Sequence, residues 1–104
     1  MEVIEKPWGF ELIWAKTDNY VGKMIHINPK QRLSLQYHNE KEETVFVIEG
    51  TLLNYTDESS PPQEIRPGQS FHVKPGLVSR ERIDRSVFLA VVSLHLYNLV
   101  VYPQ

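Results

Sequence analysis

The chain has 104 residues, which is enough for one small domain, so we expect a single unit over residues 1–104. Its composition is that of an ordinary globular protein, and a formal net charge of -2 gives no electrostatic basis for binding nucleic acid or an anionic membrane. The absence of cysteine excludes disulfides and thiolate metal sites. Because residues 1–6 have no apolar signal core and no segment has the ~20 apolar residues of a membrane helix, we expect a cytoplasmic protein.

Short β-branched and aromatic segments predict strands along the whole chain. In chain order they are residues 10–14, 23–27, 32–38, 43–49, 51–55, 70–73 and 87–93. Clusters of proline, glycine, asparagine and serine separate them, and such clusters end helices and form turns. Since no window shows a helical period, these many short strands predict an all-β sandwich or small barrel.

The strand predicted at residues 32–38 has one apolar and one polar face. Its apolar side chains are Leu33, Leu35 and Tyr37, and they alternate with Arg32, Ser34, Gln36 and His38. The polar face either meets water on an open sheet or lines a pocket. Glu43 favours a pocket, because it heads the next apolar strand, 43–49, whose two faces both look covered.

Gln36, His38 and Glu43 form a candidate metal site. Gln36 and His38 are two residues apart on a strand and so project from the same face, and a short turn brings the Glu43 carboxylate back beside them. Amide, imidazole and carboxylate ligands suit zinc, manganese, iron or nickel better than copper(I). The pattern therefore predicts a site for a divalent metal ion.

Several separate segments also follow a known family pattern in the same order. They are residues 6–9, 20–23, 32–38 leading to Glu43 and 50–51, and 67–70. Together they resemble the cupin superfamily, specifically the small cupin domain at the end of type II mannose-6-phosphate isomerase/mannose-1-phosphate guanylyltransferase proteins. The resemblance covers nearly the whole chain and implies a double-stranded β-helix, the jelly-roll barrel, with a role in carbohydrate metabolism such as polysaccharide biosynthesis.

The resemblance places the family's metal ligands on Gln36, His38 and Glu43. It also implies a fourth ligand, a histidine, shortly after a Pro-x-Gly turn, and in this chain that position holds Ser79. Because a neutral serine hydroxyl is a poor ligand for zinc-like ions, we expect weakened metal binding. His72 is a possible substitute ligand, with a plain strand residue as the alternative, and His26 and His95 are interpreted as packing or surface residues.

The resemblance implies a cupin of the mannose-6-phosphate-isomerase-like group that binds a sugar or sugar phosphate in the barrel. If the protein is an enzyme, aldose–ketose isomerisation of a sugar phosphate, or a related epimerisation, is the implied reaction. Four basic residues are candidates for phosphate or sugar contacts if they face the cavity, and surface charge is the alternative for each. They are Lys23, Arg32, Arg80 and Arg82.

Two departures from the family pattern leave a rival function open. Ser79 replaces the fourth ligand, and isomerase-type relatives continue past the last strand with an acidic segment containing tyrosine and arginine, whereas this sequence ends at Gln104. The rival is a non-catalytic carbohydrate-binding or assembly cupin without bound metal. A cupin dioxygenase would need several histidines around iron, and too few align.

A homodimer is the assembly that the resemblance implies, because small cupins often bury apolar sheet faces between subunits. Trp8, Phe10, Leu12 and Trp14 suit such an interface. The same side chains suit packing on their own barrel equally well. The sequence leaves this choice open.

Overall fold

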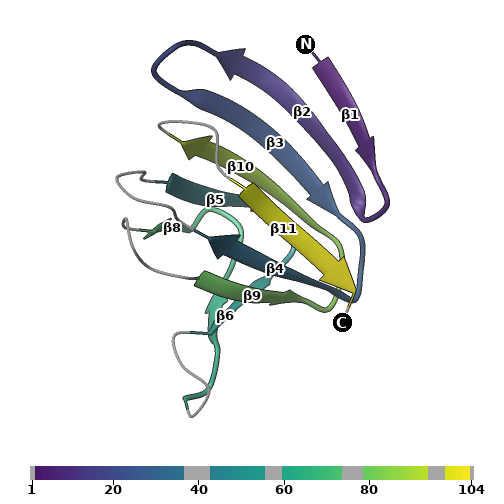
Figure 1. Cartoon of the computed structure of the whole chain (residues 1–104). Coiled ribbons are helices and arrows are strands. Elements are labelled where there is room, and N and C mark those ends of the chain that lie inside the picture. Colours follow the sequence, from purple (N-terminus) through teal and green to yellow (C-terminus); the bar gives the residue numbers. More distant parts are fainter. Residues whose placement is uncertain (1, 37–42, 56–59, 74–78, 94–97, 104) are drawn as a thin grey trace.

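The computed structural model describes residues 2–36, 43–55, 60–73, 79–93 and 98–103, and their regular secondary structure is entirely β-strand (Figure 1). The strands are β1 (Glu2–Lys6), β2 (Gly9–Lys16), β3 (Val21–Ile27), β4 (Gln31–Gln36), β5 (Glu43–Glu49), β6 (Leu52–Tyr55), β7 (Gln63–Ile65), β8 (Ser70–Val73), β9 (Ser79–Ile83), β10 (Val87–Ser93) and β11 (Asn98–Pro103). Within these ranges, no helix is long and apolar enough to cross a membrane. The prediction of an all-β fold is confirmed.

The strands form two antiparallel sheets that face each other (Figure 1). One sheet has six strands in the order β1-β2-β3-β10-β5-β8, and the other has five in the order β11-β4-β9-β6-β7. From β3 onward the chain crosses between the sheets at every connection except β6 to β7. Neighbouring strands therefore come from distant parts of the sequence, as in a jelly roll.

The core lies between the sheets and follows from the two-residue period of the strands. In β10, for example, Val87, Leu89, Val91 and Ser93 are buried, and the residues between them are more exposed. Both sheets contribute to the buried apolar cluster, whose members are Ile25, Ile27, Val45, Val47, Leu52, Ile65, Ile83, Val87, Leu89 and Val91. Trp8 and Phe71 pack against this cluster from its margin.

The outward face of the six-stranded sheet is apolar and exposed in the single chain. Phe46 is 42% exposed, and Trp14 and Val92 are exposed as well. The His26 ring stacks on Phe10, with 5.2 Å between the ring centroids, so its interpretation as a packing residue is confirmed. The interpretation that both faces of strand 43–49 are covered is wrong for the isolated chain, because β5 buries only its inward residues.

Gly50 and Gly68 lie in turns whose backbone conformation would be strained for any residue with a side chain. Gly68 has a φ of 86° and follows Pro67 in a turn closed by the Gln69 amide, which donates to the Arg66 carbonyl at 3.0 Å. Gly50 has a φ of 84°, and a Cβ there would lie 2.9 Å from Val87 Cγ1 and press on the Ser86 carbonyl oxygen. Gly50 thus allows the chain to leave β5 against the start of β10.

Candidate functional site

One end of the sandwich collects the positions predicted to hold a metal. Strand β4 ends at Gln36 and β10 ends at Ser93, whereas β5 begins at Glu43 and β9 begins at Ser79. Leu35 pairs with Ser79 across β4 and β9, and Ser93 pairs with Glu43 across β10 and β5. Figure 1 shows these strand ends together at the left of the view. The fold therefore brings the backbones of three predicted site positions to the same end.

Parts of the predicted ligand set lie outside the described residues. His38 belongs to the segment 37–42, and the side chains of Gln36 and Ser79 are not described either. His95, interpreted as a packing or surface residue, belongs to the segment 94–97 and is also outside the described residues. The convergence of Gln36, His38 and Glu43 on one ion therefore stays a prediction. Within the described ranges, no group of three or more histidine, cysteine, aspartate or glutamate side chains is arranged to hold a metal ion.

Glu43 is the predicted ligand whose side chain the structure describes. It is the first residue of β5, shares the inward face with Val45 and Val47, and is only 1% exposed. Ser93, its partner on β10, is also 1% exposed. Burying a carboxylate costs free energy that hydrogen bonds, a cation or a polar ligand must offset. An inward carboxylate at this end fits the donor chemistry of a divalent ion.

His72 lies on the wrong face to replace the missing fourth ligand. It pairs with Thr44 across β8 and β5, its side chain is exposed, and its Nδ1 lies 3.0 Å from Thr44 Oγ1. Glu43 instead pairs with Val73, one residue along each strand. Since successive strand residues project from opposite faces, His72 points outward while Glu43 points inward. The two side chains cannot share an ion in this arrangement.

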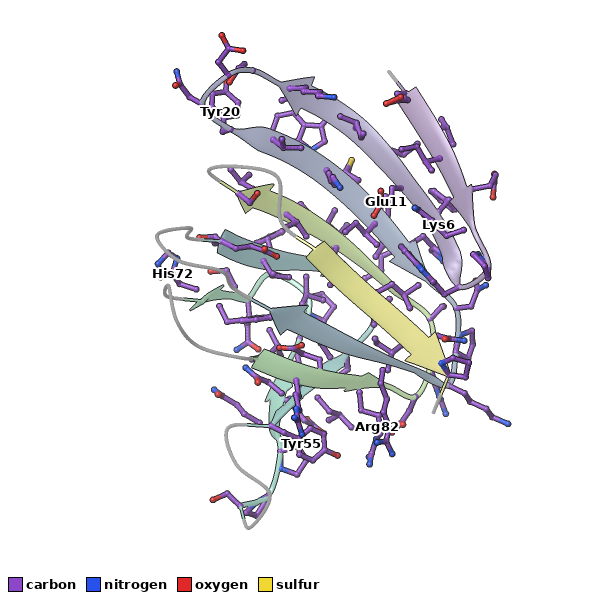
Figure 2. All side chains as sticks on the ribbon, in the orientation of Figure 1. Lys6, Glu11, Tyr20, Tyr55, His72 and Arg82 are labelled. Carbon is purple, nitrogen blue, oxygen red and sulfur yellow. The ribbon has the colours of Figure 1, made fainter. Side chains whose placement is uncertain are left out.

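Lys23 faces the interior, as a cavity contact requires. It lies on the inward face of β3 between Val21 and Ile25, and its Nζ is 3.6 Å from Glu11 Oε2. The Lys23 side chain is 15% exposed and that of Glu11 is 8% exposed. Figure 2 shows Glu11 on β2, next to β3. The two residues thus form a largely buried ion pair at the edge of the interior.

The other three basic residues lie on the outside, which agrees with the surface-charge alternative for each of them. In β9 the buried residues are Glu81 and Ile83, and Arg80 and Arg82 alternate with them on the outward face. Arg32 pairs with Arg82 across β4 and β9 and is exposed. The polar alternation of β4 and β9 could not show which face was inward. Only the packing of the two sheets decided it.

Glu81 is an interior carboxylate that the sequence reasoning missed. It is 2% exposed, and it pairs with Asn54 on β6, which is partly buried. The sequence contains an indication of its burial, because Glu81 is two residues from Ile83 and so shares a strand face with an apolar core residue. Ser79 is two residues away on the other side. The position expected to hold the fourth ligand is thus adjacent to a buried carboxylate along the same strand.

The inward charges of the described residues are mainly negative. The buried carboxylates are Glu11, Glu43 and Glu81, and Lys23 is the cation on the inward face of β3 beside one of them. In a low-dielectric interior, carboxylates attract cations and hydroxyl donors and repel a phosphate dianion. The described interior is therefore acidic apart from Lys23.

Known proteins share this architecture. Residues 1–99 match the family model described as mannose-6-phosphate isomerase C-terminal. No curated protein matches the chain. An RmlC-like cupin from Shewanella frigidimarina has 15% identity and a TM-score of 0.76, and the match covers 89% of this chain and 82% of that one.

Two other solved structures combine the fold with named activities. A sugar phosphate isomerase of the cupin superfamily from Silicibacter pomeroyi has 20% identity and a TM-score of 0.67, over 91% of this chain and 64% of that chain. An ectoine synthase from P. lautus has 16% identity and a TM-score of 0.75, over 88% of this chain and 67% of that one. At these identities the likeness shows a shared fold, because one fold supports many reactions.

Proposed function

This chain belongs to the family of mannose-6-phosphate isomerase C-terminal domains, within the cupin superfamily, and we propose that it binds a sugar or sugar phosphate between its two sheets. The observation that carries the proposal is the buried carboxylate of Glu43, paired across strands with Ser93 at one end of the interior. A few polar groups among apolar neighbours are the usual means of orienting a bound ligand. A cytoplasmic location fits such a role.

The charge distribution favours one orientation for a sugar phosphate. The hydroxyl-bearing carbons enter the interior, where the carboxylates of Glu43 and Glu81 accept hydrogen bonds. The phosphate stays near the opening, because the interior carboxylates repel it. Mannose and mannose 6-phosphate should therefore bind with similar affinity, and calorimetric titration of both sugars measures the difference.

Gln36, His38 and Glu43 are the residues that would hold a divalent ion, and Ser79 stands in the fourth position. Such an ion supplies electrophilic polarisation of the sugar carbonyl when bound. Glu43 is then occupied as a ligand. Glu81 remains as an interior carboxylate outside the predicted ligand set, and in this proposal it is the group that holds the proton. Serine in the fourth position weakens metal binding, so the metal content of the purified protein is the first quantity to measure.

Aldose–ketose isomerisation is the proposed reaction, because it requires both a proton-transferring carboxylate and polarisation of the carbonyl. The test is conversion of mannose 6-phosphate to the ketose phosphate with added zinc, manganese, nickel or iron(II). Product formation that disappears in Glu43→Gln supports the reaction. No turnover with any of these metals removes it.

A non-catalytic carbohydrate-binding cupin is the second candidate, and Ser79 is the observation that favours it. A serine hydroxyl leaves a divalent ion one strong ligand short, whereas it is well suited to hydrogen-bond a sugar. If the protein is such a cupin, calorimetry should show sugar binding that chelators do not change. The activity assay should show no turnover. Sugar binding that requires metal would contradict it.

We propose that the protein forms a homodimer whose interface is the outward face of the six-stranded sheet. The described outward residues at the centre of this face carry no charge, and Phe10, Met24, Phe46, Phe88 and Val92 give it an apolar surface. An exposed uncharged apolar face on a soluble protein is characteristic of an interaction surface. Trp8, predicted for either this interface or its own barrel, packs against its own core.

A further inference from the structure

His26 lies at the centre of a row of side chains that crosses the six-stranded sheet. It pairs with Phe10 on β2 and with Phe88 on β10. Phe10 pairs in turn with Glu5 on β1, and Phe88 pairs with Glu49 on β5 beside a bulge. Figure 1 shows these strands side by side in the order β1, β2, β3, β10 and β5. The histidine therefore has an aromatic ring on each side and a carboxylate beyond each ring.

The two phenylalanine rings hold the His26 imidazole on the outward face. The imidazole centroid is 5.2 Å from that of Phe10, with the ring planes 6° apart, and 6.3 Å from that of Phe88, with the planes 48° apart. His26 is partly exposed in the single chain. Water can therefore solvate a protonated His26 in the monomer, and the adjacent aromatic faces attract its positive charge as well. The monomer accommodates both charge states of this side chain.

A second copy of the chain on this face would make protonation of His26 costly. This step rests on the homodimer proposed above, whose interface is the outward face of the six-stranded sheet. His26 lies between Phe10 and Phe88, which belong to the apolar surface of that interface, so a partner subunit seated there would remove water from the imidazole. Loss of solvation disfavours the charged form of a titratable group.

The strands around His26 offer it no nearby counter-charge. On β2 and β10, which flank it, the outward residues near it are uncharged, and so is Met24 on its own strand. Glu5 and Glu49 each lie two strands away, or ~10 Å, which is too far for a direct ion pair. The carboxylates at the ends of the row therefore do not offset the desolvation of an imidazolium.

The turns at this end of the sheet add mainly positive charge. Lys30 is exposed after β3, and Arg85 is exposed before β10. Asp84 lies in the same turn as Arg85, but its Oδ1 is 3.0 Å from Nε of Arg82. His72 is the other described histidine on this side of the sheet, and it lies on β8, beyond β5. None of these groups favours a protonated His26 inside an interface.

We propose that His26 makes the dimer sensitive to pH. Its neutral imidazole is compatible with the buried interface, whereas its imidazolium is compatible with the solvated face of the monomer. Histidine is the side chain that ordinarily changes charge between about pH 5 and pH 8. Because a two-fold interface contains the same residue from both subunits, dissociation takes up two protons. The affinity of the dimer is therefore full above the titration range of histidine and falls as the pH decreases through that range.

The test is sedimentation equilibrium of the native chain at about pH 8 and about pH 5.5, with circular dichroism to verify folding at each pH. The dissociation constant of the dimer should be about tenfold or more higher at the lower pH. His26→Phe removes the titrating group but keeps a ring in the row, so its dissociation constant should change less than about threefold. His72→Gln is the matched control, because His72 is an exposed histidine on the outward side of the same sheet. This variant should keep the pH dependence.

The possible results separate this proposal from the dimer itself. A monomer at both pH values would remove the dimer and the pH effect together. A folded dimer of unchanged affinity at about pH 5.5 would overturn the pH effect and leave the dimer standing. Equal loss of affinity in His26→Phe would assign the pH dependence to other groups. The native chain gives a further check should this variant not fold: the midpoint of the His26 imidazole titration, followed by NMR, should move to lower pH at higher protein concentration, and a midpoint independent of concentration would contradict the proposal.

Discussion

Glu43 and Ser93 face each other across the pairing of β5 with β10, and each side chain is only 1% exposed. The same two strands supply Val45, Val47, Leu89 and Val91 to the apolar core. The interior of the sandwich therefore changes from apolar to polar along a single pair of strands. This change places the candidate site at the end of the β5–β10 pair where Glu43 and Ser93 are buried.

Replacing Glu43 with glutamine should abolish most divalent-metal binding. The amide preserves the shape of the side chain but removes the negative charge, and we expect the dissociation constant for zinc or manganese to rise by about 10-fold to 100-fold. Glu49→Gln is the matched control, because Glu49 is exposed on the same strand. Isothermal titration of both variants gives the comparison. Unchanged zinc affinity in Glu43→Gln would remove Glu43 from the ligand set.

Restoring a histidine at position 79 should strengthen the metal site. Ser79→His supplies the imidazole that the family pattern places there, and we expect zinc affinity to increase about tenfold or more. Ser86→His is the control, because Ser86 is an exposed serine between β9 and β10. Metal content after dialysis is the simplest readout. Equal metal uptake by the two variants would show that position 79 does not contribute to the site.

Alanine at Gly50 should destabilise the fold more than alanine at Gly68. Both glycines have a positive φ, which costs another residue ~1–2 kcal/mol. A Cβ at Gly68 meets nothing within 4 Å, whereas one at Gly50 meets Val87 Cγ1 and the Ser86 carbonyl. We therefore expect Gly50→Ala to lower the free energy of unfolding by a further ~2 kcal/mol. Urea unfolding of the two variants measures this difference in the free energy of unfolding. Equal losses of stability would mean that the backbone where β5 ends against β10 shifts to accommodate the new Cβ.

A charge at Phe46 should prevent dimer formation. Phe46→Lys places an ammonium at the centre of the outward apolar face, and its desolvation in an interface would be costly. Tyr20→Lys is a control of equal exposure, because Phe46 and Tyr20 are each 42% exposed and Tyr20 lies in the turn before β3. Sedimentation velocity should show a dimer for Tyr20→Lys and a monomer for Phe46→Lys. A dimer in both variants would place the interface elsewhere.

The sequence by itself determined the all-β class, most strand positions and the family. Alternating apolar residues and turn-forming clusters are local signals, so seven predicted strands correspond to β2–β6, β8 and β10. Strands β1, β7, β9 and β11 were not predicted. The polar sequence of β9, Ser79–Ile83, has little strand propensity of its own. It forms a strand because β4 and β6 pair with it on either side.

Only the tertiary structure decided which polar side chains face inward. A two-residue period separates two faces but does not say which face meets the core, since that depends on how the sheets pack. This packing turned Glu81 inward and placed Arg32, Arg80 and Arg82 outside. It likewise placed His72 beside Thr44 on the outer face and Lys23 beside Glu11 on the inner one. Face selection is a property of the assembled sandwich, because the burial that favours one face exists only once both sheets are present.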